Sequence, residues 1–311
     1  MPATYTPVRY PGGKTKIYPT VDSIIEANGL EGCAYAEAFC GGCGLAIKLL
    51  VRERVSRLLL NDIDPAVYSM WDVIVNRPDE LCRFISEVPL TVEEWRTHHG
   101  RLLEADAPSP GLGKSAFYLN RTNRSGILRG GPIGGKGQTG RYGIGARFNR
   151  KNLCEKIRKI SSHAENIRIY NMDASRFIDD VLANETGQVF ANFDPPYVEK
   201  GPGLYANSFT ESDHKALAQK ISSCAFPWIV TYDAVPLVDR AYERFDRYDL
   251  VIGYSAATSK VGREILVTGP GVEMPEGLLP RRKDARQDEE QGISAEEGVP
   301  DPDRMSAIPE A

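Results

Sequence analysis

A carboxylate, two prolines and an aromatic ring follow directly on a short apolar run. The run, residues 188–191, has the length and composition of a buried strand, and it continues into Asn192-Phe193-Asp194-Pro195-Pro196-Tyr197. Because neither proline can donate a hydrogen bond to a sheet, the strand must end there. In open α/β sheets that edge binds ligands. A lone proline pair more often marks an ordinary turn, but the motifs below favour a site built on this segment.

A second candidate site element is a strand that leads through a glycine loop into a helix. Residues 33–39 predict the strand, residues 40–44 the loop, and residues 45–54 the helix, the first half of a nucleotide-binding unit. The loop glycines allow close approach of a ligand to the backbone, although their spacing is not that of a dinucleotide fingerprint. The loop also contains the C-x-x-C pair Cys40 and Cys43. Since no second pair of ligands accompanies it, we predict no metal site.

The following strand, residues 57–60, ends in acidic residues. Asp62 lies about twenty residues after Gly41, the spacing at which an acid binds ribose hydroxyls. Asp64 directly precedes Pro65, which is typical of a helix cap. We therefore predict that Asp62 is the ribose ligand and Asp64 is structural.

The N-terminal segment contains a glycine turn. Gly13-Lys14-Thr15 resembles the end of a P-loop, but that motif needs a glycine where Val8 stands and a strand before it. A P-loop is therefore rejected. The turn still predicts that Tyr10 and Lys14 lie close to an anionic or aromatic ligand.

The composition is that of a soluble globular protein with one large or two modest domains. The 311 residues are 41% hydrophobic and 26% charged, and no apolar run reaches membrane-spanning length. The start of the chain has no signal-peptide character, and the six cysteines suggest reduced thiols. We therefore expect a cytoplasmic protein with no membrane partner.

Positive charge is concentrated in one part of the chain. Residues 111–160 contain twelve Lys or Arg and the single acid Glu155, which favours a phosphate backbone as partner over a merely solvated loop. Residues 65–106 predict helices with boundaries near Pro78, Pro89 and Pro108. The glycine- and arginine-rich stretch 108–148 predicts a nucleic-acid recognition insert that buries no core of its own and is partly ordered only on binding.

The remaining sequence predicts four further strands of the same sheet. Strands are expected at 166–170, 228–232, 248–251 and 264–268, with helices around 148–163, 173–184 and 211–224. Beyond Gly271 the chain is rich in proline and charge, and residues 272–311 have a net charge of −6. That tail is expected to be disordered.

These motifs, in this order, resemble the Dam-type adenine-specific DNA methyltransferases over roughly residues 7–271. The likeness rests on five elements: Tyr-Pro-Gly-Gly-Lys, Glu-Ala-Phe-x-Gly, Asn-Asp-Ile-Asp, a basic insert with Tyr-Leu-Asn-Arg, and Asp-Pro-Pro-Tyr. It implies an α/β fold, a Rossmann-like S-adenosylmethionine-dependent methyltransferase sheet with a reversed last strand and an inserted DNA-recognition subdomain. The implied division is a catalytic domain of residues 1–64 and 149–271, an insert of residues 65–148, and a tail of residues 272–311.

The resemblance also implies the reactants. S-adenosylmethionine is the expected methyl donor, and the N6 amine of a flipped-out adenine in double-stranded DNA is the expected acceptor. A cognate restriction endonuclease is a further partner that the likeness allows. The same motif would also permit RNA adenine or the N4 amine of cytosine as acceptor. A non-catalytic DNA-binding protein on a methyltransferase scaffold is the alternative from another class.

Site residues follow from the resemblance position by position, except Arg124, which is assigned from its place in the glycine- and arginine-rich stretch. The catalytic residues are Asp194, Pro195, Pro196 and Tyr197; the cofactor-binding residues are Tyr10, Lys14, Phe39, Gly41, Asp62, Asp173 and Asp194; the DNA-binding residues are Asn120, Arg121, Arg124 and Arg129. The family usually has a second loop glycine where Cys43 stands, and it usually has tryptophan or another aromatic at Tyr10. Residues 122–124 diverge from the family, so the recognised DNA sequence is not carried over.

The chemistry expected of residues 194–197, the catalytic segment, is the activation of a weak nucleophile, the adenine N6 amine. The lone pair of the adenine N6 amine is delocalised into the ring. The Asp194 carboxylate and the Pro195 carbonyl could each accept one amine hydrogen, which would free that lone pair for the methyl group. Tyr197 is expected to stack on the target base.

Overall fold

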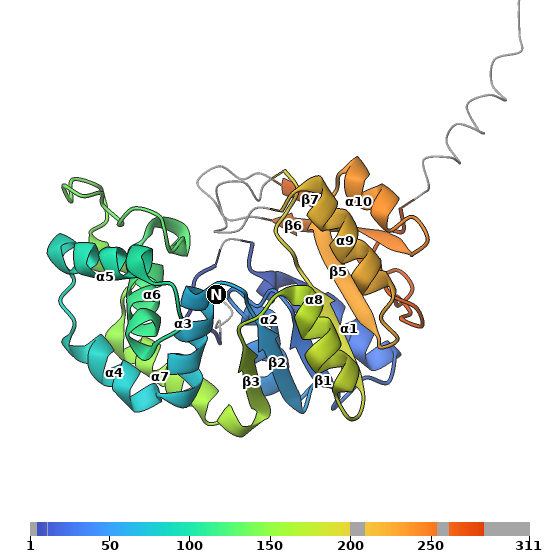
Figure 1. The fold of residues 1–311 in the computed structure, drawn as a ribbon, viewed down its shortest axis with the longest axis horizontal. Helices are drawn as coiled ribbons and strands as arrows, with labels where there is room; N and C mark the ends of the chain where they lie inside the picture. Colours follow the sequence, from blue (N-terminus) through green and yellow to red (C-terminus); the bar gives the residue numbers. More distant parts are fainter. Residues whose placement is uncertain (1–4, 11, 200–208, 254–260, 283–311) are drawn as a thin grey trace, which may run out of the picture.

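A single mixed sheet organises the molecule. The computed structural model describes residues 5–10, 12–199, 209–253 and 261–282, and within them seven strands have the order β3-β2-β1-β4-β5-β7-β6 (Figure 1). Five neighbouring strands, from β3 to β5, are parallel, whereas β7 runs antiparallel to both β5 and β6. Each predicted strand is present. The strands are β1 Ala34–Glu37, β2 Arg57–Asn61, β3 Ile167–Tyr170, β4 Val189–Phe193, β5 Trp228–Asp233, β6 Arg247–Gly253 and β7 Val261–Thr268.

Proline begins several of the helices. Pro65, Pro78, Pro110 and Pro236 each occupy the first helical position, where the missing N–H has no intrahelical partner to lose. The predicted boundaries near Pro78, Pro89 and Pro108 are confirmed. The helices are α1 Tyr18–Ala27, α2 Gly44–Val51, α3 Pro65–Asn76, α4 Pro78–Glu87, α5 Val92–Glu104, α6 Pro110–Thr122, α7 Arg150–Ser161, α8 Ala174–Arg176, α9 Glu211–Ser222 and α10 Pro236–Ala241.

The sheet separates two hydrophobic cores because successive side chains on a strand point to opposite faces. On β4, Phe190 packs with α1 and α2, whereas Ala191 and Phe193 pack with α8 and α9. On β5, Ile229 belongs to the core that contains Phe190, the first core. Trp228 and Val230 belong to the core that contains Ala191 and Phe193, the second core. Helices therefore cover both faces of the sheet. This leaves the ends of the strands as the place where a ligand can reach the sheet.

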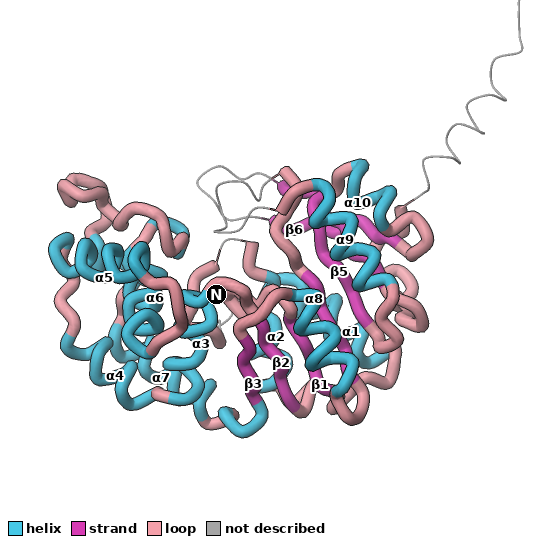
Figure 2. Tube along the Cα trace, viewed as in Figure 1, coloured by secondary structure: helices cyan, strands magenta, loops and turns pink. Residues whose placement is uncertain are grey.

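Helices α3 to α7 gather beside the β3 end of the sheet, where Figure 2 shows mostly helix and loop. Within this group α6 packs against α3 and α5, and it buries residues such as Leu112 and Phe117. The prediction that the stretch 108–148 buries no core is therefore wrong for α6. The apolar side chains recur at helical spacing there, and Gly113 lets α6 approach α3 closely.

Gly113→Ala is expected to destabilise this helical group by about 2–3 kcal/mol. A methyl group at Gly113 would lie 2.2 Å from the backbone oxygen of Ser69, which cannot move without shifting α3. Gly111→Ala on the same helix is the matched control, because its methyl group would meet nothing nearer than 3.9 Å. Urea unfolding should show a loss only for Gly113→Ala, and equal stability of the two variants would contradict the packing argument.

The C-terminal part of the described chain, residues 272–282, packs against the first hydrophobic core. Val272 is buried, Met274 and Leu279 contact the same core, and the Arg282 N–H donates to the Arg247 carbonyl at 2.8 Å. The predicted disorder beyond Gly271 is therefore wrong for residues 272–282. The apolar side chains there are isolated between prolines and contact the core one by one. The sequence therefore shows no helical pattern of apolar residues that would predict an ordered segment. The rest of the predicted tail, residues 283–311, lies outside the described residues.

One short helix, α10, was not predicted from the sequence.

Across the described ranges, no helix combines the length and the apolar character needed to cross a membrane.

Candidate active site

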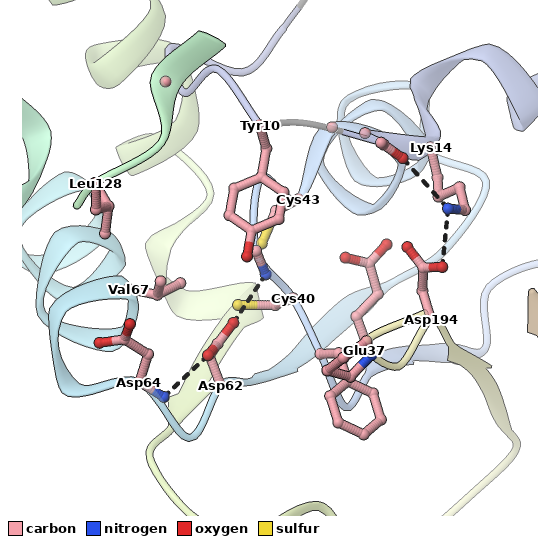
Figure 3. A pocket seen from close by; sticks show the side chains of 18 of the residues that line it. Tyr10, Lys14, Glu37, Cys40, Cys43, Asp62, Asp64, Val67, Leu128 and Asp194 are labelled. Atoms are coloured by element: carbon pink, nitrogen blue, oxygen red, sulfur yellow. Dashed lines mark hydrogen bonds and ion pairs between the residues drawn. The ribbon is translucent and has the colours of Figure 1, made fainter. Parts of the chain in front are cut away.

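One cavity at the carboxyl edge of the parallel strands brings the main candidate residues together. It has a volume of about 390 Å³, and segments from the N-terminus, β1, β2, β4 and the 126–130 loop line it (Figure 3). Six of the seven predicted cofactor-binding residues lie on its wall: Tyr10, Lys14, Phe39, Gly41, Asp62 and Asp194. The residues assigned from the resemblance therefore share one space although up to 184 positions separate them in the chain.

Backbone conformation shapes the glycine loop. Gly41 has φ = 43° and Cys43 has φ = 44°, both in the left-handed region. A Cβ on Gly41 would lie 2.7 Å from the Tyr10 ring, and one on Gly42 would lie 2.6 Å from the Tyr10 Cβ. The Trp71 indole N–H donates to the Gly41 carbonyl at 2.8 Å. The loop thus keeps a glycine-like turn at Cys43 and presents bare backbone to the cavity.

Asp62 is held on both oxygens by backbone donors. The N–H of Gly41 donates to Oδ2 at 3.1 Å, and the N–H of Asp64 donates to Oδ1 at 3.0 Å. Burial raises the pKa of Asp62 to about 7, and these two hydrogen bonds oppose the rise. The predicted helix cap is confirmed, because the Asp64 side chain accepts from Ala66 N–H at 2.8 Å.

The catalytic candidate Asp194 contacts two side chains through one oxygen. The Lys14 ammonium lies 2.8 Å from Oδ1, and the Thr231 hydroxyl donates to the same oxygen at 2.8 Å. Lys14 also donates to the Tyr197 hydroxyl at 2.6 Å and lies 3.6 Å from Glu264. Lys14 therefore joins the N-terminal glycine turn to the catalytic segment.

The other members of the motif differ in exposure. Pro196 lines the cavity, whereas Pro195 is buried and Tyr197 is only 6% exposed. Tyr197 packs in the second core beside Tyr232. Tyr197 is not among the described residues that line the cavity.

Two buried polar residues at the cavity, Glu37 and Asn192, belong to motifs of the sequence analysis but were given no role there. Glu37 ends β1 and pairs in register with Asn192 on β4. Burial, and then the nearby Asp194 charge, raise the pKa of Glu37 to about 8. The Oδ1 atom of Asn192 accepts no hydrogen bond from the described residues. The signal that could have identified both was a polar residue inside an otherwise apolar strand.

Glu37→Gln is expected to flatten the pH dependence of stability. The folded protein retains a proton on Glu37 that the unfolded chain loses above its ordinary pKa of 4.5. Stability should therefore fall as pH rises from about 4.5 to about 8, by at most about 1.4 kcal/mol per pH unit from this group. Urea unfolding between these pH values measures it, and equal slopes for wild type and Glu37→Gln would refute the assignment.

The predicted DNA-binding residues have different surroundings. Arg124 and Arg129 are exposed, and Arg129 lies at the cavity wall, 3.4 Å from Asp64. The guanidinium of Arg121 donates to the carbonyls of Arg147 and Pro7. These contacts tie the helical group to the N-terminal segment.

Two predicted roles need correction. Asn120 is 0% exposed, and its amide bonds the backbone of Arg9 and Gly126, so it cannot reach a DNA base. Asp173 does not line the cavity and caps α8 by accepting from Ser175 N–H at 2.8 Å. Both side chains hold backbone in place, a role that residue type alone does not distinguish from ligand binding.

Comparison with known proteins adds one finding to this geometry. The family model described as D12 class N6 adenine-specific DNA methyltransferase matches residues 10–251. The matched range includes the cavity wall and all predicted catalytic residues. A search of curated proteins finds no match to this chain.

Proposed function

The chain belongs to the D12 class of N6 adenine-specific DNA methyltransferases, and on this premise we propose that it methylates the N6 amine of an adenine flipped out of double-stranded DNA, with S-adenosylmethionine as donor. The observation that carries the proposal is the shared cavity. Asp194 lines the same space as the Gly41 loop and Asp62. A carboxylate beside a nucleotide-binding loop is the arrangement that methyl transfer to an amine needs.

The residues at the cavity fit this cofactor. S-adenosylmethionine supplies a methyl group activated by a sulfonium centre. Asp62 would hold ribose hydroxyls, and the bare backbone at Gly41 leaves room for close approach. Tyr10 and Phe39 offer aromatic walls. The buried Oδ1 of Asn192, which accepts no hydrogen bond from any described residue, is an acceptor for a cationic amino group.

Asp194 and Pro195 would act on the acceptor amine. The carboxylate and the Pro195 carbonyl each accept one amine hydrogen and so favour the pyramidal nitrogen whose lone pair can attack. No strong base is needed, since the methylated amine loses its proton readily. Tyr197 would stack on the base only after its hydroxyl leaves Lys14, because the ring is buried in contact with that residue.

DNA would be bound by the helical group and its loops. We propose residues 65–148 as the target-recognition insert and residues 1–64 with 149–271 as the catalytic domain, whose sheet has β7 as the reversed strand. The exposed Arg124 and Arg129 are suited to phosphate contacts beside the cavity. A DNA-associated cytoplasmic location and a cognate restriction endonuclease stay predictions from the sequence.

Radiolabel transfer tests the function. Purified protein is incubated with methyl-labelled S-adenosylmethionine and, in separate reactions, unmethylated plasmid DNA or RNA, and each nucleic acid is digested to nucleosides. We expect the label in N6-methyladenine. Label in N4-methylcytosine, transfer to RNA alone, or no transfer by protein whose folding is verified by circular dichroism would each contradict the proposal.

A further inference from the structure

Asp194 is oriented by two donors that meet on the same atom. Lys14 Nζ and Thr231 Oγ1 each lie 2.8 Å from Oδ1. Oδ2 accepts no hydrogen bond within the described part of the chain. In Figure 3 the Asp194 oxygen that is not joined to Lys14 points toward Glu37, another residue of the cavity wall. The carboxylate therefore has one oxygen that accepts from two donors and one that accepts from none of the described residues.

The strand register places Thr231 beside Asp194. β4 and β5 are parallel, with Phe193 paired to Val230, so the next residues on each strand are neighbours. Thr231 is 0% exposed, and its hydroxyl bonds this carboxylate. Two residues further along β5, Asp233 accepts from the N–H groups of Val198 at 3.1 Å and Glu199 at 2.9 Å. The end of β5 thus holds the catalytic segment both at Asp194 and just after Tyr197.

We propose that Thr231 is a positioning residue for methyl transfer, whose hydroxyl holds Oδ1 of Asp194 so that Oδ2 faces the acceptor amine. This inference rests on the proposed function, because only that reaction brings an amine to Asp194. A single donor fixes a distance and leaves the carboxylate free to rotate about its Cβ–Cγ bond, a broad torsion. A second donor, approaching from β5, fixes the plane of the carboxylate as well.

Three variants test the inference. Thr231→Val keeps the shape of the side chain and loses the hydroxyl, whereas Thr231→Ser keeps the hydroxyl. Thr268→Val makes the same change at a buried threonine on β7, away from the cavity. Single-turnover methyl transfer is measured at saturating cofactor and DNA, together with the dissociation constants of both. We expect Thr231→Val to be about 10- to 100-fold slower with unchanged dissociation constants, because loss of alignment affects the chemical step.

Recovery of most of the rate in Thr231→Ser and a wild-type rate in Thr268→Val complete the expected result. A wild-type rate in Thr231→Val, an effect on binding alone, or an equal loss in Thr268→Val would overturn the inference. Absence of transfer in the wild-type protein would count against the proposed function instead.

Thermal unfolding gives a readout that does not depend on activity. If the Thr231 hydroxyl acts on Asp194, Thr231→Val should lower the Tm when Asp194 is present and should not lower it in an Asp194→Ala background. The reason is that the hydroxyl loses its partner in that background. The same Tm shift in both backgrounds would overturn the coupling.

Discussion

Asp194→Asn is expected to slow methyl transfer by about a thousandfold or more while DNA and cofactor still bind. An amide usually replaces a carboxylate conservatively, but here the surroundings decide which way it points. Lys14 and Thr231 both donate to Oδ1, so the amide oxygen must occupy that position. The NH2 group then replaces Oδ2 and presents hydrogens to an amine that needs an acceptor.

Single-turnover transfer measures the effect, with gel-shift and calorimetric assays for the two ligands. Asp180→Asn is the matched control, since Asp180 is exposed and its carboxylate pairs only with Arg176 among the described residues. A rate within about tenfold of wild type would show that Asp194 does not accept from the amine, since loss of one such contact costs more than that. Loss of DNA binding along with activity would point instead to a scaffold role.

The sheet could be predicted because each strand carries its own local signal. Apolar runs such as 188–191 are bounded by glycine and proline, and the observed strands differ from the predicted ones mainly at their ends. The shared site at the carboxyl edge followed from the same reasoning, because parallel strands bring their ends together whatever their separation in sequence. Asp62 and Asp194 both line the cavity for this reason.

Contacts between distant segments could not be predicted in this way. Nothing local distinguishes Asn120, which bonds backbone, from an asparagine that reads a base. Thr231 and Asp233 gave no signal because their role depends on which strand lies beside β4. The glycine content of the basic stretch concealed α6, because Gly113 serves close helix packing there.

Lys14→Met is expected to lower the free energy of unfolding by about 3 kcal/mol, because it removes a buried cation from between the partly exposed carboxylate of Asp194 and the buried one of Glu264. Lys14 is 7% exposed and lies 2.8 Å from Asp194 and 3.6 Å from Glu264, which is itself 0% exposed. Desolvating a carboxylate without a nearby cation is costly, and the methionine side chain replaces only the aliphatic part of the lysine. Urea unfolding at neutral pH measures the loss.

The double variant Lys14→Met/Glu264→Gln identifies the cause of that loss. If the loss comes from the charge left on Glu264, neutralising this residue should restore much of the stability, and the two changes should be strongly non-additive. Lys215→Met is the matched control, because Lys215 is an exposed lysine that lies 2.7 Å from Glu211, and such surface pairs contribute little. An additive double variant would mean that Lys14 stabilises the fold by packing alone, and the link between the glycine turn and the catalytic carboxylate would then have no electrostatic basis.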